Sequence, residues 1–113
     1  MKVVVAFVRR RMLENILTAL QDIDGLTGAS LQDVKGFGRG RARNSGETEW
    51  EEGFLLLSKV RMEIYCSDNI CGAVVDALRN AAHTGLRGDG KVYIADVEQA
   101  VRISSGESGD LAV

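Results

Sequence analysis

The order of apolar patterns along the chain constrains the fold more than any other feature of the sequence. Residues 1–8 form a β-branched run and residues 26–35 a second strand pattern, while residues 12–24 between them have helical periodicity. The same strand–helix–strand order recurs over residues 59–97, after a long interruption. Two such halves predict an α+β, ferredoxin-like split βαβ (βαβ-βαβ) fold. Its antiparallel four-stranded sheet has two helices on one face and a long loop between strands 2 and 3.

The periodicities also predict which side chains are buried. Apolar residues at i, i+3, i+4 and i+7 mark the inner face of the first helix: Leu13, Ile16, Leu17 and Leu20. Strict alternation over residues 59–66 predicts a half-buried strand with its inward face made of Val60, Met62, Ile64 and Cys66. The second helix is expected to follow Asp68, whose carboxylate can cap the first backbone N–H groups.

The remaining segments predict turns, loops and short strands. Residues 9–11 are three arginines that mark an exposed turn, and residues 36–56 contain five glycines among charged residues with no lasting periodicity. This second stretch predicts a long loop with strand-like ends, and a loop of this length in a compact domain usually has a function. We expect a strand over residues 91–97, a further short strand over residues 99–104 and a flexible tail over residues 105–113.

The composition limits the classes of function. With 113 residues and a hydrophobic fraction of 45%, the chain can bury one core, so we expect a single domain over residues 1–113. The net charge of −2 argues against nucleic-acid binding, which favours a strong basic excess. No apolar run approaches the length of a membrane span, and two cysteines fit a reducing compartment. We therefore expect a cytoplasmic protein that is not embedded in a membrane.

Three segments could carry a function. Gly36-Phe37-Gly38-Arg39 would let the backbone approach a ligand closely, or it is an ordinary turn at a strand end. Residues 84–91, TGLRGDGK, could point several backbone N–H groups at a phosphate, with Arg87 and Lys91 adding charge, or form a common tight turn. They lack the spacing of a P-loop. The third segment is a basic and then acidic run between residues 39 and 52, which can also be a solvated surface.

Together, these segments resemble the PII signal-transduction proteins over nearly the whole chain. The specific parts are VKGFGR at residues 34–39, Lys59-Val60 and the TxxxGDGK core within residues 84–94, with Tyr93 where Phe or Trp is usual. Residues 101–107 also run parallel to the family's tail. The resemblance implies a homotrimer that binds an adenine nucleotide (ATP, ADP or AMP) between subunits, and it leaves the participation of Mg²⁺ open. It implies a regulator without catalytic residues or a metal site, rather than an enzyme.

The resemblance assigns residues to three sets. The nucleotide-binding set is Ser30, Gly36, Phe37, Gly38, Arg39, Glu63, Tyr65, Thr84, Gly85, Arg87, Gly88, Asp89, Gly90, Lys91 and Arg102. The set for a small anionic effector, such as bicarbonate or 2-oxoglutarate, is Gly40 and Lys59. A T-loop at about residues 37–58 would dock on a target, either a transporter or a metabolic enzyme, and its partner-binding set is Arg41, Arg43, Glu47, Glu49, Trp50, Glu51 and Glu52.

Departures from the family pattern limit what the resemblance carries over. Glu52 stands where many members have a modifiable tyrosine, so we expect no nucleotidylation of this loop. Gly40 replaces the glutamine that meets Mg²⁺ and 2-oxoglutarate, which predicts weak or absent 2-oxoglutarate sensing. Ser104 replaces a second arginine near the polyphosphate. Nucleotide binding therefore carries over better than effector binding does.

Two other functions remain open from the residues alone. A ferredoxin-like nucleotide-hydrolysing enzyme would need a general base, and the single histidine, His83, is more typical of a helix C-terminus. A metal-responsive trimer of similar fold could use Cys66 and Cys71, although two thiols without further ligands rarely hold a metal.

Overall fold

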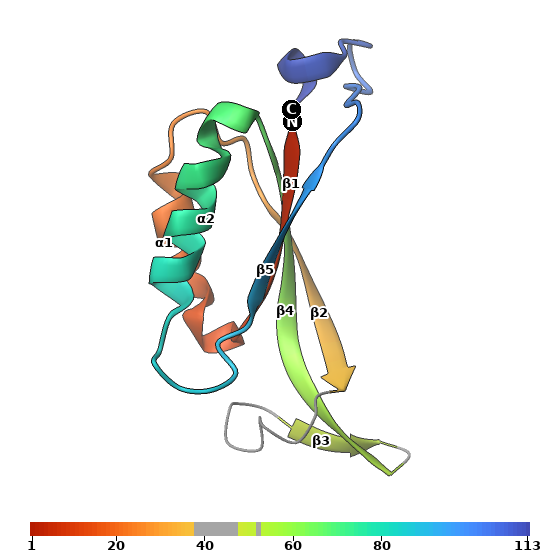
Figure 1. The fold of residues 1–113 in the computed structure, drawn as a ribbon. Coiled ribbons are helices and arrows are strands. Elements are labelled where there is room, and N and C mark those ends of the chain that lie inside the picture. Colours follow the sequence, from red (N-terminus) through yellow and green to blue (C-terminus); the bar gives the residue numbers. More distant parts are fainter. Residues whose placement is uncertain (38–47, 52) are drawn as a thin grey trace.

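Four strands form an antiparallel sheet in the order β2-β4-β1-β5 (Figure 1). The computed structural model describes residues 1–37, 48–51 and 53–113, and for residues 48–51 it describes the backbone alone. The strand bounds are β1 Lys2–Val8, β2 Ser30–Phe37, β4 Phe54–Cys66 and β5 Lys91–Asp96. Because β1 pairs with both β4 and β5, the first and last strands lie side by side. The strand order and the antiparallel pairing confirm the ferredoxin-like prediction.

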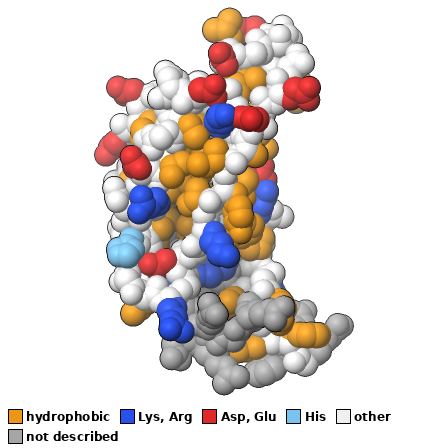
Figure 2. Space-filling view, viewed as in Figure 1, with side chains coloured by type: hydrophobic (Ala, Val, Ile, Leu, Met, Phe, Trp, Pro, Cys, Tyr) orange, Lys and Arg blue, Asp and Glu red, His pale blue; other side chains and the backbone are white. Residues whose placement is uncertain are grey.

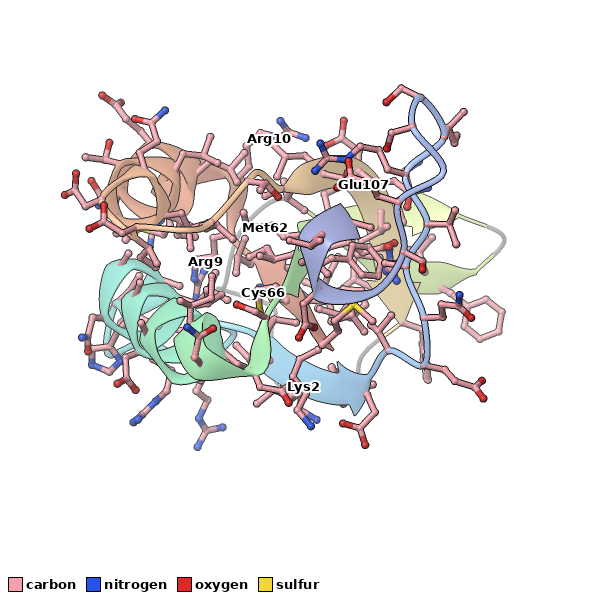
Figure 3. The ribbon with its side chains drawn as sticks, turned by 90° about the horizontal axis from the view of Figure 1, so that it is seen from above. Lys2, Arg9, Arg10, Met62, Cys66 and Glu107 are labelled. Atoms are coloured by element: carbon pink, nitrogen blue, oxygen red, sulfur yellow. The ribbon has the colours of Figure 1, made fainter. Side chains whose placement is uncertain are left out.

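Two helices cover one face of this sheet (Figure 1). They are α1, Leu13–Gln21, which follows the short 3₁₀ turn η1, Arg10–Met12, and α2, Asp68–Ala82. Their inner residues Ile16, Leu20, Val74 and Leu78 are buried, as the helical periodicity predicts. In Figure 3, Met62 and Cys66 point from the sheet toward the helices, so the core occupies the layer between them.

The register explains why the sheet has one buried face. Val4 lies opposite Ile64, Ala6 opposite Met62 and Val8 opposite Val60, and all six side chains are at most 2% exposed. The alternation predicted for residues 59–66 is therefore confirmed, because side chains in a strand point alternately to opposite faces. The other face of β4 presents Arg61, Glu63 and Tyr65.

The long loop predicted over residues 36–56 is shorter than the sequence suggests. Strand β2 continues to Phe37, β4 begins at Phe54, and a further strand, β3 (Thr48–Glu51), pairs with the start of β4. β4 thus extends beyond the helix-covered part of the sheet, with β2 on one side and β3 on the other (Figure 1). The rings of Phe37 and Phe54 meet edge to face on this extension, with their centroids 5.9 Å apart. Pairing with β4 gives strand conformation to residues whose glycines and charges, taken alone, predict a loop.

Two smaller predictions also need correction, and the structure adds detail to a third. Asp68 is the first residue of α2 and makes no capping bond; its carboxylate instead accepts a hydrogen bond from the Met1 amino group at 2.8 Å. Residues 99–104 form no strand, and only a single bridge joins Val101 to Ser108. The tail folds back through this bridge into a 3₁₀ turn, η2, Gly109–Ala112, so the segment predicted to be flexible has a defined fold, and its mobility remains a prediction. Among the described helices, none is long and apolar enough to cross a membrane.

Candidate functional site

The glycine-rich loop of residues 84–90 connects α2 to β5 and packs against the end of β1. Gly85, Gly88 and Gly90 all have positive φ angles, a backbone conformation that side chains with a Cβ disfavour. At Gly90 the φ angle is 110°, and a Cβ atom built there would lie 1.7 Å from the carbonyl oxygen of Phe7. The loop therefore approaches β1 so closely that only glycine fits at this position.

The carboxylate of Asp89 holds the loop together from within. It accepts hydrogen bonds from the backbone N–H of Thr84 at 2.8 Å and of Gly85 at 3.3 Å, and another from the Thr84 hydroxyl. The Nδ1 atom of His83, the residue after α2, lies 3.6 Å from the same carboxylate. Burial raises the pKa of Asp89, but the hydrogen bonds from Thr84, Arg9 and Gly85 outweigh it and lower the pKa to about 2.

Arg9 is the buried partner of this carboxylate, and sequence reasoning missed it. Its Nε lies 3.3 Å from Asp89, and another guanidinium nitrogen donates to the carbonyl oxygen of Arg87. Only 5% of Arg9 is exposed, so the predicted exposed turn at residues 9–11 is wrong for its first residue. In Figure 3, Arg10 lies at the outside of the molecule, whereas Arg9 lies further in. Nothing in three consecutive arginines singles out the one whose partner lies 80 residues away.

Lys59 joins strand β4 to the same loop. Its ammonium group donates to the carbonyl oxygen of Gly88, and burial, together with the nearby charge of Arg9, lowers the pKa of Lys59. The lysine predicted for an anionic effector thus lies against the loop predicted for the nucleotide phosphates. Because β4 also carries the hairpin with β3, one side chain links the loop to the base of that hairpin.

A second group of predicted residues lines a separate cavity of about 320 Å³. Ser30 pairs in register with Glu63, and Tyr65 donates a hydrogen bond to the Glu63 carboxylate at 2.9 Å. Arg61 also donates to Glu63, and these two bonds, that of Arg61 first, lower the pKa of Glu63. Residues 27–29 complete the described lining, which includes nothing from the 84–91 loop.

Other predicted residues lie elsewhere or outside the described part. Arg102 donates to the carbonyl oxygen of Leu111 at 3.2 Å, so in a single chain it belongs to the C-terminal turn. The residues outside the described part are Gly38, Arg39, Gly40, Arg41, Arg43, Glu47 and Glu52. The backbone alone is described for Glu49, Trp50 and Glu51. The described residues that the resemblance assigns to nucleotide binding thus fall into groups that one chain does not bring together.

The described residues also bear on the metal alternative. Cys66 is buried in the core, Cys71 is half-buried on α2, and both are free thiols. Within residues 1–37, 48–51 and 53–113, no three His, Cys, Asp or Glu side chains form a group that could hold a metal ion. The two cysteines therefore have no third described ligand.

The low pKa of Asp89 predicts an acid-sensitive loop. With a folded pKa of about 2 and an ordinary value of 3.8, the ionised carboxylate stabilises the fold fully above about pH 4, and this stabilisation is lost as the pH falls through 2. We expect the difference in unfolding free energy between the wild type and Asp89→Asn to shrink across this window. Urea denaturation at pH 7, 4, 3 and 2 measures it. A difference that stays constant down to pH 2 would show that the carboxylate's charge is not what holds the loop.

Comparisons with known proteins agree with this architecture. The family model described as nitrogen regulatory protein P-II matches residues 1–107. The chain is 39% identical over 113 residues to the nitrogen regulatory protein P-II of Rhizobium meliloti (strain 1021), covering 96% of each chain. It is 40% identical over 111 residues to that of Bradyrhizobium diazoefficiens, again covering 96% of each. Against nitrogen regulatory protein P-II 1 of Escherichia coli (strain K12), identity is 37% over 117 residues and covers all of both chains.

Proposed function

The chain belongs to the nitrogen regulatory protein P-II family, and we propose from this premise that it is a homotrimeric sensor of adenine nucleotides. Membership makes it a regulatory signal-transduction protein rather than an enzyme. The proposal adds that ATP, ADP or AMP binds between subunits and alters how the hairpin beyond β4 meets a target protein. The target would be a transporter or a metabolic enzyme of the cytoplasm.

The observation that carries the nucleotide proposal is the arrangement of the 84–91 loop. Asp89 is held by hydrogen bonds from the loop and by its ion pair with Arg9, while Arg87 and Lys91 are exposed. A loop with glycines at positive φ, backbone amides and two exposed cations suits a polyphosphate, because anions are stabilised by oriented N–H groups and by opposite charge. Asp89 and Arg9 would set the shape of the loop, and Lys91 would meet the phosphates.

Assembly from several copies would bring the separated groups together. The cavity beside Ser30 and Glu63, the 84–91 loop and Arg102 lie on different parts of one chain, so a site between copies accounts for all three. The sheet face away from the helices also exposes Tyr65 and Tyr93, with the Tyr93 ring 6.2 Å from that of Phe7. Figure 2 shows further hydrophobic side chains along β5. Exposed apolar area of this kind is typical of an interface.

Lys59 would couple the nucleotide site to the hairpin. Its bond to the Gly88 carbonyl would change if a ligand moved the loop, and β4 would carry that change toward β3. A small anion such as bicarbonate or 2-oxoglutarate could compete for the same ammonium group. We propose no fixed role for Mg²⁺, because Gly40 supplies no side-chain oxygen for its coordination shell. Trp50 and the neighbouring glutamates remain the proposed contacts to the target.

Calorimetric titration with ATP, ADP and AMP, with and without Mg²⁺, tests the nucleotide proposal. We expect binding, and we expect Lys91→Ala and Arg102→Ala each to weaken it by roughly 1.5–3 kcal/mol, the value of a charged hydrogen bond. Arg11→Ala, an exposed arginine in the turn after β1, is the matched control and should leave the affinity unchanged. Light scattering on the same samples should give the mass of three chains. A monomer, or an assembled protein that binds none of the three nucleotides, would overturn the proposal.

A further inference from the structure

Two cysteines lie on either side of the turn that joins β4 to α2, and neither has a role in the nucleotide proposal. Cys66 is the last residue of β4, and Cys71 lies in the first turn of α2. Between them the backbone N–H of Ile70 donates to the carbonyl oxygen of Ser67 at 3.3 Å, which closes the turn. In Figure 3, Cys66 lies where β4 runs into α2. Both cysteines are free thiols.

The two thiols approach each other in the layer between the sheet and the helices. Cys66 is 1% exposed within the core, and Cys71 packs against that core from α2. Burial raises the pKa of the Cys66 thiol, and the charge of Cys71 and a hydrogen bond with it raise this pKa further. Because a disulfide needs two cysteines whose side chains already lie close together, this contact supplies what the bond requires.

The two thiols differ in their access to solvent, which gives them different roles. Cys71 is half-buried, so a small oxidant can reach its sulfur, whereas Cys66 has almost no exposed surface. The raised pKa also keeps Cys66 protonated, and a thiol reacts with oxidants far more slowly than a thiolate does. An oxidant therefore meets Cys71 first, and Cys66 can react only afterwards, with the oxidised Cys71.

We propose that Cys66 and Cys71 form a reversible oxidation site for hydroperoxides, in which Cys71 is oxidised first and Cys66 then closes an intramolecular disulfide. With hydrogen peroxide, the Cys71 sulfur attacks one peroxide oxygen and the O–O bond breaks, which leaves a sulfenic acid on Cys71 and releases water. The Cys66 sulfur then displaces the hydroxyl group, forming the S–S bond and releasing a second water. The two thiols lose two electrons and two protons, and the peroxide is reduced to water. In a reducing compartment a dithiol would reverse the reaction, so the disulfide would be transient.

This oxidation site is separate from the residues proposed to bind the nucleotide. Tyr65, which precedes Cys66 on β4, lines the cavity beside Ser30 and Glu63, but neither cysteine is among the described lining residues of that cavity. The disulfide would tie the first turn of α2 to the strand that carries this wall. The inference does not depend on the proposed function, and a failure of nucleotide binding would leave it unaffected.

Mass spectrometry of the reduced, full-length assembled protein after treatment with hydrogen peroxide tests the inference. We expect the intact chain to lose two hydrogens, to lose both of its maleimide-reactive thiols after denaturation, and to recover them with dithiothreitol. A protease that cuts before aspartate cleaves at Asp68 and so separates Cys66 from Cys71, and the two fragments should stay joined until reductant is added. Thiols that both remain reactive, or a disulfide that joins two chains, would overturn the inference.

Trapping with dimedone, a reagent for sulfenic acids, tests the order of the two steps in the same wild-type protein. In the folded state we expect the adduct on Cys71 and not on Cys66, because only Cys71 has access to the oxidant. In urea we expect adducts on both cysteines, because unfolding exposes the buried thiol. Equal labelling of the two cysteines in the folded protein would contradict the roles assigned to them.

Two variants separate the roles of the thiols. Cys66→Ala should raise the level of sulfenic acid trapped on Cys71 roughly tenfold and let it pass to sulfinic acid, which dithiothreitol does not restore. Cys71→Ser should slow the oxidation of Cys66 roughly tenfold, whereas Ala73→Ser, at an exposed position on α2, should behave like the wild type. Oxidation of Cys66 at the wild-type rate in Cys71→Ser would overturn the inference. The wild-type mapping needs no variant, so it decides the inference even if Cys66→Ala folds poorly.

Discussion

Replacing Arg9 with alanine is expected to destabilise the fold by about 3–5 kcal/mol, the usual cost of removing one partner of a buried ion pair. The side chain is 5% exposed and bonds both the Asp89 carboxylate and the Arg87 carbonyl. Without it, the half-buried carboxylate of Asp89 would lose its ion-pair partner, and the loop would lose two bonds to the turn after β1. Urea denaturation at a fixed protomer concentration measures the change, since assembly shifts apparent stability.

The neighbouring arginine supplies a matched control for this prediction. Arg11 is exposed and lies two residues further along the chain, so Arg11→Ala should change the unfolding free energy by no more than about 0.5 kcal/mol. Arg9→Lys keeps the charge but loses the forked geometry that reaches two acceptors, and should fall between the two. If Arg9→Ala proved no worse than Arg11→Ala, the buried pair would contribute nothing to the stability of the loop.

Much of the fold could be predicted because its signals are local. The alternation from Val60 to Cys66 and the helical spacing from Leu13 to Leu20 each report burial on one face, and the structure buries those faces. The extension of β4 to Phe54 could not be predicted in this way. Residues 54–58, FLLLS, do not alternate, and their strand conformation depends on pairing with β2 and β3.

The sequence predicts the backbone conformation of the candidate loop, but not the side chains that hold the loop in place. The glycines of the TGLRGDGK segment predict a loop, and all three have positive φ angles in the structure. The family resemblance placed Asp89 in the nucleotide-binding set, which stays a prediction, but did not indicate that its carboxylate accepts hydrogen bonds from the loop and from Arg9. Which of several similar arginines becomes buried depends on the tertiary position of β1 beside the loop. No local periodicity carries that information.

Gly90→Ala is expected to have the second large effect, and it separates steric fit from flexibility. Its φ angle of 110° alone would cost a side chain roughly 1–2 kcal/mol. A Cβ would also lie 1.7 Å from the Phe7 carbonyl oxygen, a backbone atom inside the β1–β5 ladder that cannot rotate away. The loop must therefore move, and we expect a total loss of more than about 3 kcal/mol, together with weakened nucleotide binding.

Substitutions at two other glycines separate the conformational part of this loss in stability from the steric part. Gly85 has a φ angle of 83° with open space around its Cβ position, so Gly85→Ala should cost only the conformational part, roughly 1–2 kcal/mol. Gly28 has neither a positive φ angle nor a close neighbour, and Gly28→Ala should stay within about 0.5 kcal/mol of the wild type. Urea denaturation of the three variants should rank them Gly90, Gly85, Gly28 in order of decreasing loss. If Gly90→Ala matched Gly85→Ala, β1 would be yielding to the added methyl group, and the loop's position would depend on the bonds from Arg9 and Lys59 rather than on its contact with the Phe7 carbonyl.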